Sequence, residues 1–221
     1  MVLYLSTIFV ALALMFLPMV CVAQVPNFAT TVGDGKLYGY SALNTLVGSD
    51  VYNAYTTFQY GVGSDFAFGV SYSSSEMVRD FGVTARFGHE FSKWIKVGAQ
   101  LTPMFDMNDK FSFAYLSGGL YGQGQITNDG NLFWLSNTWL DVNDDGVESV
   151  SQYWYLCRHF NFENGNSITP MLGLLHSWEF DEDLNVAAGF YYSYKLINLY
   201  LWGDRFFEDN PRLNIGLEFA F

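Results

Sequence analysis

The sequence predicts an all-β fold: one membrane-spanning antiparallel up-and-down β-barrel of about 12 strands, joined by short loops. Three observations support this fold class. Apolar residues alternate with polar or small residues along many segments, and acidic residues concentrate between those segments. In addition, residues 212–221 form a strand pattern with one wholly apolar face.

The alternation is clearest in residues 66–72. Phe66, Phe68 and Val70 fall on one face of a strand, and small residues occupy the positions between them. Successive side chains of a strand point to opposite faces, so this period of two indicates a β-strand with two different surfaces. The same pattern recurs in residues 81–88, 95–102 and 184–193. Runs of about ten residues are long enough for a tilted barrel strand to cross a bilayer.

Alternating runs and turn residues divide the chain into the expected strands. Turn signals such as Asn128-Asp129-Gly130 and Asp144-Asp145-Gly146 separate neighbouring runs. A barrel of ten strands is the alternative, if the pair 131–141 and 149–161 lies partly outside the membrane. The expected strands are 36–46, 51–62, 65–73, 79–91, 94–104, 110–125, 131–141, 149–161, 167–180, 184–195, 197–206 and 211–221.

The period of two does not show which face points outward, so other features must decide. The face opposite the apolar one is rich in Gly, Ser, Thr, Asn and Gln, which suits a lumen better than a solvated exterior. Aromatic residues cluster near expected strand ends, as interfacial girdles do. These residues are Tyr38, Tyr40, Tyr60, Trp94, Trp134, Trp139, Trp154, Trp178, Trp202 and Phe206. We therefore favour a membrane barrel over a secreted soluble β-barrel.

Composition and charge agree with walls in lipid and rims in water. Aromatic residues make up 19% of the chain and charged residues only 14%, against about 25% charged residues in ordinary globular proteins. Acidic residues outnumber basic ones 22 to 10, giving a formal net charge of −12. This balance argues against nucleic acid as a partner, because nucleic-acid binding needs a basic surface. Most of the acidic residues fall in the expected loops.

Residues 1–23 are expected to be a signal peptide that leaves residues 24–221 as one barrel domain. An apolar run spans residues 12–20, and small residues precede the junction between Ala23 and Gln24. A membrane anchor is the alternative, because the segment is long enough to span a bilayer and its start carries no Lys or Arg. Cys157 would then be the one cysteine of the mature chain, which excludes an intramolecular disulfide.

The C-terminal strand carries a recognisable pattern. Asn214 is followed by Gly216, and then by Phe219 and the terminal Phe221. In this respect the sequence resembles the bacterial outer-membrane β-barrels. The resemblance implies that the last strand pairs with the first, that both termini are periplasmic, and that the barrel-assembly machinery reads this pattern. Outer loops are then expected around 47–50, 74–78, 105–109, 142–148, 181–183 and 207–210.

Polar residues on the expected strands are the candidate pore lining. A charge facing the middle of the bilayer costs about 2–4 kcal/mol, so these side chains should point inward. The alternative is a closed lumen that small barrels fill with their own side chains. The candidate residues are Arg86, Lys96, Gln100, Asn185, Asn214 and Glu218.

One loop has the start of a calcium-binding pattern. Asp141, Asn143 and Asp145 place oxygen ligands at alternate positions, and Gly146 occupies the sixth position. The twelfth position is Gln152 rather than Glu, so a hairpin tip closed by Asp-Gly is the favoured interpretation. We therefore expect no cofactor, and a weak calcium site in this loop is the alternative.

The histidines do not form a catalytic motif. His89, His159 and His176 lie on separate expected strands, and His176 and Ser177 point to opposite faces. We therefore expect no enzyme. The sequence predicts an outer-membrane porin-like channel for passive diffusion of small hydrophilic solutes, with a preference for cations. Membrane lipids and small solutes are the expected partners. A closed structural or surface-interaction barrel is the alternative function.

Overall fold

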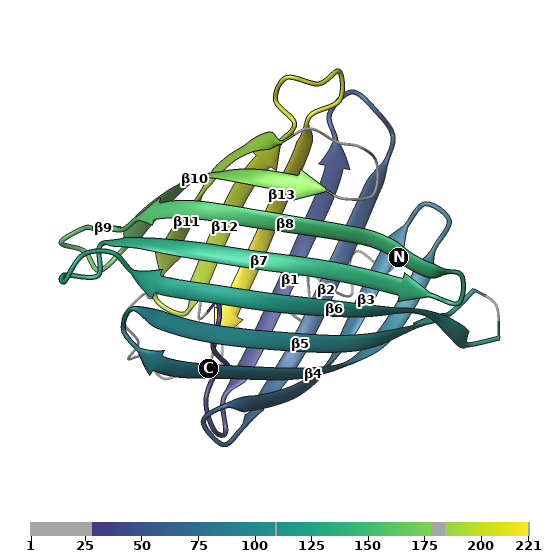
Figure 1. Cartoon of the computed structure of the whole chain (residues 1–221), viewed down its shortest axis with the longest axis horizontal. Coiled ribbons are helices and arrows are strands. Elements are labelled where there is room, and N and C mark those ends of the chain that lie inside the picture. The colour runs from purple at the N-terminus through teal and green to yellow at the C-terminus, as the bar shows by residue number, and fades with distance from the viewer. Residues whose placement is uncertain (1–27, 109, 178–183, 221) are drawn as a thin grey trace.

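The structure is a computed structural model, and it describes residues 28–108, 110–177 and 184–220. The chain is wound into one barrel of β-strands (Figure 1). The expected signal peptide lies outside the described residues. No helix in these ranges is long and apolar enough to cross a membrane.

The described strands follow one another around the barrel in chain order. They are β1 (Leu37–Leu46), β2 (Tyr52–Val62), β3 (Phe66–Ser75), β4 (Arg79–Ser92), β5 (Ile95–Asp106), β6 (Ser112–Gln125), β7 (Leu132–Asn143), β8 (Gly146–Arg158), β9 (Phe160–Asn161), β10 (Ser167–Ser177), β11 (Asn185–Tyr194), β12 (Ile197–Asp204) and β13 (Arg212–Ala220). Because β8 and β9 both pair with β10, they form one wall strand interrupted at His159. The 13 described strands therefore make a 12-strand barrel, as predicted.

Closure of the barrel involves the first and last described strands. β1 pairs with β13 along its length, from Tyr38 opposite Ala220 to Leu46 opposite Arg212. β10 pairs with β11 on the other side, and every described pair is antiparallel. Closure satisfies backbone N–H and C=O groups that an open sheet edge would expose to lipid. The ten-strand alternative is wrong, because β7 and β8 pair with each other and with both outer neighbours.

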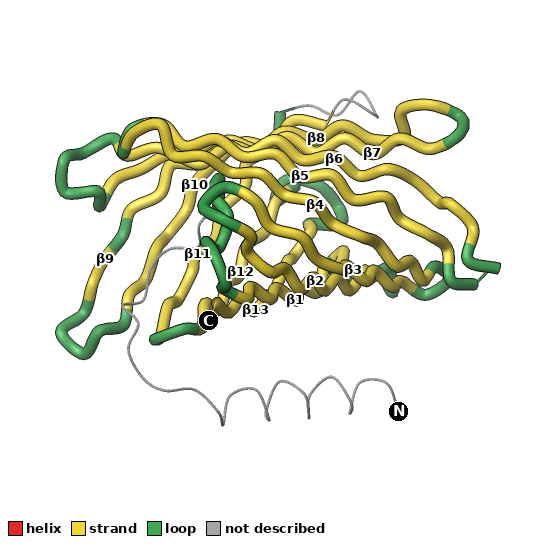
Figure 2. Tube along the Cα trace, turned by 90° about the horizontal axis from the view of Figure 1, so that it is seen from below, coloured by secondary structure: helices red, strands yellow, loops and turns green. Residues whose placement is uncertain are grey.

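The connections lie at two opposite ends of the barrel (Figure 2). We call the end that holds the start of β1 and the end of β13 the terminal end, and the opposite one the loop end. The connections 63–65, 93–94, 126–131, 162–166 and 195–196 lie at the terminal end. The described connections 47–51, 76–78, 144–145 and 205–211 and the described residues 107, 108, 110 and 111 lie at the loop end, where the outer loops were expected. The expected loop centre 181–183 lies outside the described residues.

Strand boundaries agree with the sequence pattern, with one informative difference. The eighth strand begins at Gly146 rather than near residue 149. The backbone N–H of Asp145 donates to Asn143 Oδ1 at 2.9 Å, and Gly146 has a φ of 124°. This compact turn lets β7 and β8 pair up to Asn143 and Gly146, so the hairpin extends further than the alternation indicated.

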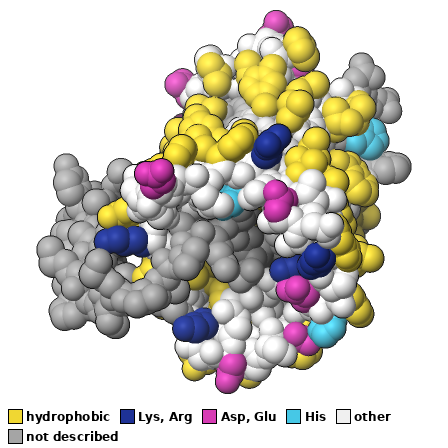
Figure 3. All heavy atoms as spheres, turned by 90° about the vertical axis from the view of Figure 1, so that its left-hand side faces the viewer, with side chains coloured by type: hydrophobic (Ala, Val, Ile, Leu, Met, Phe, Trp, Pro, Cys, Tyr) yellow, Lys and Arg dark blue, Asp and Glu magenta, His cyan; other side chains and the backbone are white. Residues whose placement is uncertain are grey.

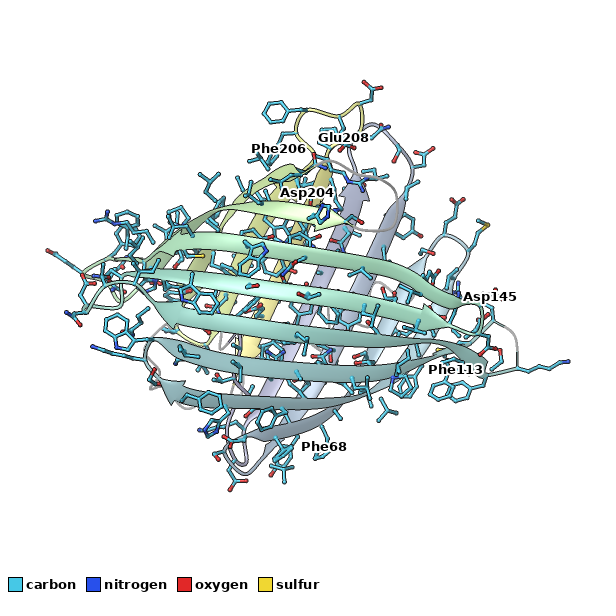
Figure 4. The ribbon with its side chains drawn as sticks, in the orientation of Figure 1. Phe68, Phe113, Asp145, Asp204, Phe206 and Glu208 are labelled. Carbon is cyan, nitrogen blue, oxygen red and sulfur yellow. The ribbon has the colours of Figure 1, made fainter. Side chains whose placement is uncertain are left out.

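The apolar faces of the strands point outward. Phe68 is 53% exposed, Leu120 63% and Leu172 62%, whereas the inward-facing Thr84 is fully buried. Figure 4 shows Phe68 projecting away from the wall. In Figure 3, apolar side chains gather along the upper and right-hand margins, with charged side chains scattered between them. An apolar outside around a polar inside is the arrangement of a membrane barrel and not of a soluble one.

Candidate transport lumen

A cavity of about 730 Å³ occupies the inside of the barrel. All 12 wall strands contribute side chains to its lining. It extends from Leu46 and Val51 at the loop end to Phe28, Arg86 and Tyr121 deeper inside. Its volume falls in the range of about 300–1,000 Å³ that small-molecule sites occupy.

Four of the six candidate pore-lining residues line this cavity. They are Arg86, Gln100, Asn214 and Glu218. Lys96 and Asn185 are not part of the lining. Lys96 Nζ pairs with Glu90 Oε2 at 2.7 Å near the terminal end, and Asn185 begins β11 at the loop end. That these side chains line a conducting pore stays a prediction.

The wall formed by β2 to β5 carries a belt of hydrogen-bonded polar side chains. The hydroxyl of Ser71 lies 2.8 Å from that of Thr84, which lies 3.1 Å from that of Thr102. Gln59 Nε2 donates to Gln100 Oε1 at 3.4 Å in the same belt. These groups belong to neighbouring strands at the same level of the barrel. They satisfy one another, so this belt is polar without being charged.

An ion pair at the loop end escaped the sequence analysis. Asp204 is fully buried, and Arg212 donates to its two carboxylate oxygens at 2.8 and 3.1 Å. Arg212 Nη2 also donates to the hydroxyl of Tyr153 at 2.8 Å. Figure 4 places Asp204 just below the loop that carries Phe206 and Glu208. Alternation puts both charges on inward faces, but only the register of β12 on β13 shows that they are direct neighbours.

The wall opposite the polar belt is aromatic. Tyr153 and Tyr155 stack with ring centroids 5.9 Å apart, and Tyr40 and Tyr200 stack at 5.7 Å. Tyr191 contacts Tyr200 at 5.4 Å. These rings come from β1, β8, β11 and β12. All five rings also line the cavity, so this part of its lining is aromatic.

Part of the predicted aromatic girdle is wrong. Tyr38, Tyr40, Trp139 and Trp202 line the cavity instead of facing lipid, because their strand positions share the parity of the inward residues. Tyr60 and Trp154 face outward as expected, with 54% and 52% exposure. The expected girdle residue Trp178 lies outside the described residues. For these residues the two criteria disagreed. Nearness to a strand end indicated the lipid interface, whereas alternation correctly indicated the lumen.

The chain segment before β1 forms the floor of the cavity. Arg86 Nη2 donates to the backbone carbonyl of Phe28, and its guanidinium lies 4.6 Å from the ring centroid of Tyr121. The ring of Phe28 meets that of Tyr121 edge to face at 5.5 Å. Ala29 is fully buried and Thr31 is 5% exposed. Residues 28–33, which we call the floor segment, therefore pack inside the barrel at its terminal end.

Glycines on the inner wall make room for the floor segment. A Cβ on Gly61 would lie 1.7 Å from the backbone oxygen of Gly33, and one on Gly88 would lie 2.6 Å from the Cα of Thr30. A Cβ on Gly98 would lie 2.5 Å from the backbone oxygen of Ala29. Any larger residue at these positions would push backbone against backbone. Alternation along the strands could not predict that these glycines contact the floor segment, because such contacts depend on the tertiary structure.

The loop with the calcium-like pattern is a hairpin tip. Asp141 Oδ2 accepts a hydrogen bond from Ser149 Oγ at 3.0 Å, and Asn143 Oδ1 accepts the one from Asp145 N. Figure 4 shows Asp145 at the tip between β7 and β8. No group of three or more His, Cys, Asp or Glu able to hold a metal occurs among the described residues. Calcium binding here stays a prediction, and calorimetric titration with Ca²⁺ tests it.

The proposed assembly signal is divided between the two faces of β13. Asn214 and Gly216 point inward and are buried, whereas Phe219 lies on the outward face. Phe221 lies outside the described residues. Reading of this strand by the barrel-assembly machinery stays a prediction.

Two of the three histidines, His89 and His159, have local partners at the terminal end. His89 Nδ1 lies 2.9 Å from Asp65 Oδ2, and this hydrogen bond lowers the pKa of the Asp65 carboxyl. His159 Nδ1 lies 2.7 Å from the hydroxyl of Thr169, which is fully buried. Neither contact presents an accessible nucleophile beside a base, which is what covalent catalysis requires.

Comparison with known proteins places the fold among porins. A solved structure of the KdgM porin has a TM-score of 0.61 and 10% sequence identity, covering 83% of this chain and 99% of that one. A structure of the NanC porin has a TM-score of 0.52 and 13% identity, covering 83% and 98%. The chain has the barrel fold of these porins.

Sequence-based comparisons give no family. No protein-family model matches the chain, and no curated protein matches it. Because the identities are low, this likeness shows architecture, and the function must be argued from the lumen of this chain.

Proposed function

We propose that the protein is an outer-membrane channel for the passive diffusion of small hydrophilic solutes. The observation that carries this proposal is the cavity of about 730 Å³, lined by both polar and aromatic side chains, inside a barrel with an apolar exterior. Amide and hydroxyl side chains such as Asn44, Asn137, Thr57 and Ser151 line it, and such groups accommodate water and polar solutes. A second KdgM structure is described as a complex with disordered oligogalacturonate, which supports solute passage through a barrel of this fold.

The channel is proposed to prefer cations because of its loop end. The connections there and the strand ends beside them carry Asp50, Glu76, Asp144, Asp145, Glu148, Glu208 and Asp209. The lumen itself is not acidic, because its lining holds Arg86, Arg205 and Arg212 against Asp141 and Glu218. The preference would therefore come from cations gathering at the mouth. Salt should weaken it, since the Debye length is about 10 Å at 0.1 M.

Swelling of protein-loaded liposomes in small sugars tests the channel. Swelling that slows as the solute becomes larger is the expected result, and folded barrels that admit no solute would contradict it. A reversal potential across a salt gradient tests selectivity. We expect a reversal potential of the cation-selective sign at low salt, and a smaller one at high salt. A reversal potential of the anion-selective sign would contradict the proposed cation preference.

The floor segment favours a second candidate, a closed structural or surface-interaction barrel. Residues 28–33 and Arg86 occupy the terminal end of the lumen, so solute passage requires space beside them or movement of them. If the barrel is closed, liposomes swell no faster with the folded protein than without it. The acidic loop end would then be the functional surface.

A further inference from the structure

We propose that the loop-end half of the lumen is a binding site for a neutral saccharide. This inference rests on the proposed channel function and names the class of solute that the lumen recognises. It starts from two tryptophans that face the cavity, Trp139 on β7 and Trp202 on β12.

Both indoles are held in place by tyrosine rings. Trp139 meets Tyr121 edge to face at 5.6 Å, and Trp202 meets Tyr153 in the same way at 5.6 Å. Both tryptophans are partly exposed, whereas both tyrosines are nearly buried. In a membrane barrel, tryptophan is normally most stable at the lipid–water interface. Two indoles held in place at the wall of the cavity therefore offer flat apolar surfaces to a solute.

Amides lie beside these surfaces. Asn53, Asn44, Asn214 and Trp202 are consecutive cross-strand neighbours on β2, β1, β13 and β12, and all four line the cavity. On the opposite side, Trp139 is the cross-strand neighbour of Ser151 and lies two residues from Asn137. Each tryptophan is thus next to neutral hydrogen-bonding groups. A sugar ring has apolar C–H faces and hydroxyl edges, which match this combination.

The charges of the lining argue against an acidic sugar. Arg212 is bound to Asp204 and Tyr153, and Arg86 to the backbone of Phe28. Arg205 Nη1 lies 3.9 Å from Glu208 Oε2. All three lining arginines thus have protein partners, while the carboxylates of Asp141 and Glu218 also line the cavity. A solute carboxylate would have to compete with these protein partners for an arginine, and at the loop end it would also meet the carboxylate of Asp141.

Equilibrium dialysis of the full-length mature protein, refolded in LDAO, tests the proposal. LDAO has no sugar headgroup, so it does not compete for the site. The probes are labelled maltotriose and its acidic counterpart trigalacturonate. We expect maltotriose to bind more tightly than trigalacturonate. We expect Trp139→Leu and Trp202→Leu each to weaken maltotriose binding about tenfold, the effect of one aromatic contact.

Trp154→Leu is the matched control, because Trp154 lies on β8, between β7 and β12 in the wall, but faces outward with 52% exposure. It should bind maltotriose as the wild type does. Heat-modifiable mobility on SDS gels verifies that each variant is folded. The proposal is overturned if the folded wild type binds neither sugar, if trigalacturonate binds as tightly as maltotriose, or if Trp154→Leu weakens binding as much as Trp202→Leu. Dialysis does not depend on conduction, so failure of binding and failure of the channel are separate results.

Discussion

At the scale of single residues, the buried carboxylate of Asp204 is the most consequential polar group. Arg212→Leu removes its ion-pair partner, and loss of one partner of a buried pair costs about 3–5 kcal/mol. We expect the free energy of unfolding in urea to fall by about that amount. The double variant Asp204→Leu/Arg212→Leu should recover most of the loss, because no buried charge is then left unpaired. A double variant no more stable than Arg212→Leu would contradict this account.

A second residue-scale prediction concerns pH and the turn between β6 and β7. Asp129 accepts hydrogen bonds from Thr127 Oγ1 and from the backbone and side chain of Asn131, and these bonds lower the pKa of its carboxyl. Because the pKa of this carboxyl is lower in the folded protein than in the unfolded chain, the carboxylate stabilises the fold at pH values above the unfolded-state pKa. The contribution is lost as the pH falls below about 4.

Asp129→Ala should therefore lower the urea midpoint at neutral pH, and the difference from wild type should shrink in acid. Midpoints measured across the acid range check this expectation. An equally large difference at both ends of the range would mean that the carboxylate charge is not involved.

At the scale of elements, the floor segment depends on the inner glycines. Gly88→Val places side-chain atoms where the backbone of Thr30 lies, so the segment must leave its position. We expect this variant to have a larger single-channel conductance than the wild type, because the terminal end of the lumen is then less occupied. Gly118→Val is the control: Gly118 faces outward, and a Cβ there meets only the backbone oxygen of Leu140 at 3.7 Å. Equal conductance in both variants would show that residues 28–33 do not limit the pore.

The strands were predictable from the sequence, but the contacts that their inward-facing side chains make inside the barrel were not. Alternation in β3, β4, β5 and β13 is strict, because one face meets lipid and the other meets the lumen. It therefore assigned Gln100 and Glu218 correctly to the inner face. It could not show that Lys96 is engaged by Glu90, since that depends on how β4 pairs with β5.

At the scale of the whole molecule, closure follows from the sequence but the contents of the lumen do not. An apolar strand such as β13 would expose unpaired backbone groups at an open sheet edge, and β1 provides the partner that removes this edge. Contacts between strands produce the Asp204–Arg212 pair and the aromatic side of the lumen. The floor segment belongs to a part of the chain without regular secondary structure. Periodicity within one strand carries no information on these contacts. For Trp139 and Trp202 the error had another source: their nearness to strand ends indicated the lipid interface, although the alternation places both in the lumen.

The central claim is that this lumen conducts, and single-channel recording in a planar bilayer tests it most directly. Protein shown to be folded by heat-modifiable mobility should give discrete current steps, with a cation-selective reversal potential across a salt gradient at low ionic strength. Folded barrels that insert without any step above the bare bilayer would contradict the channel and leave the closed barrel as the function.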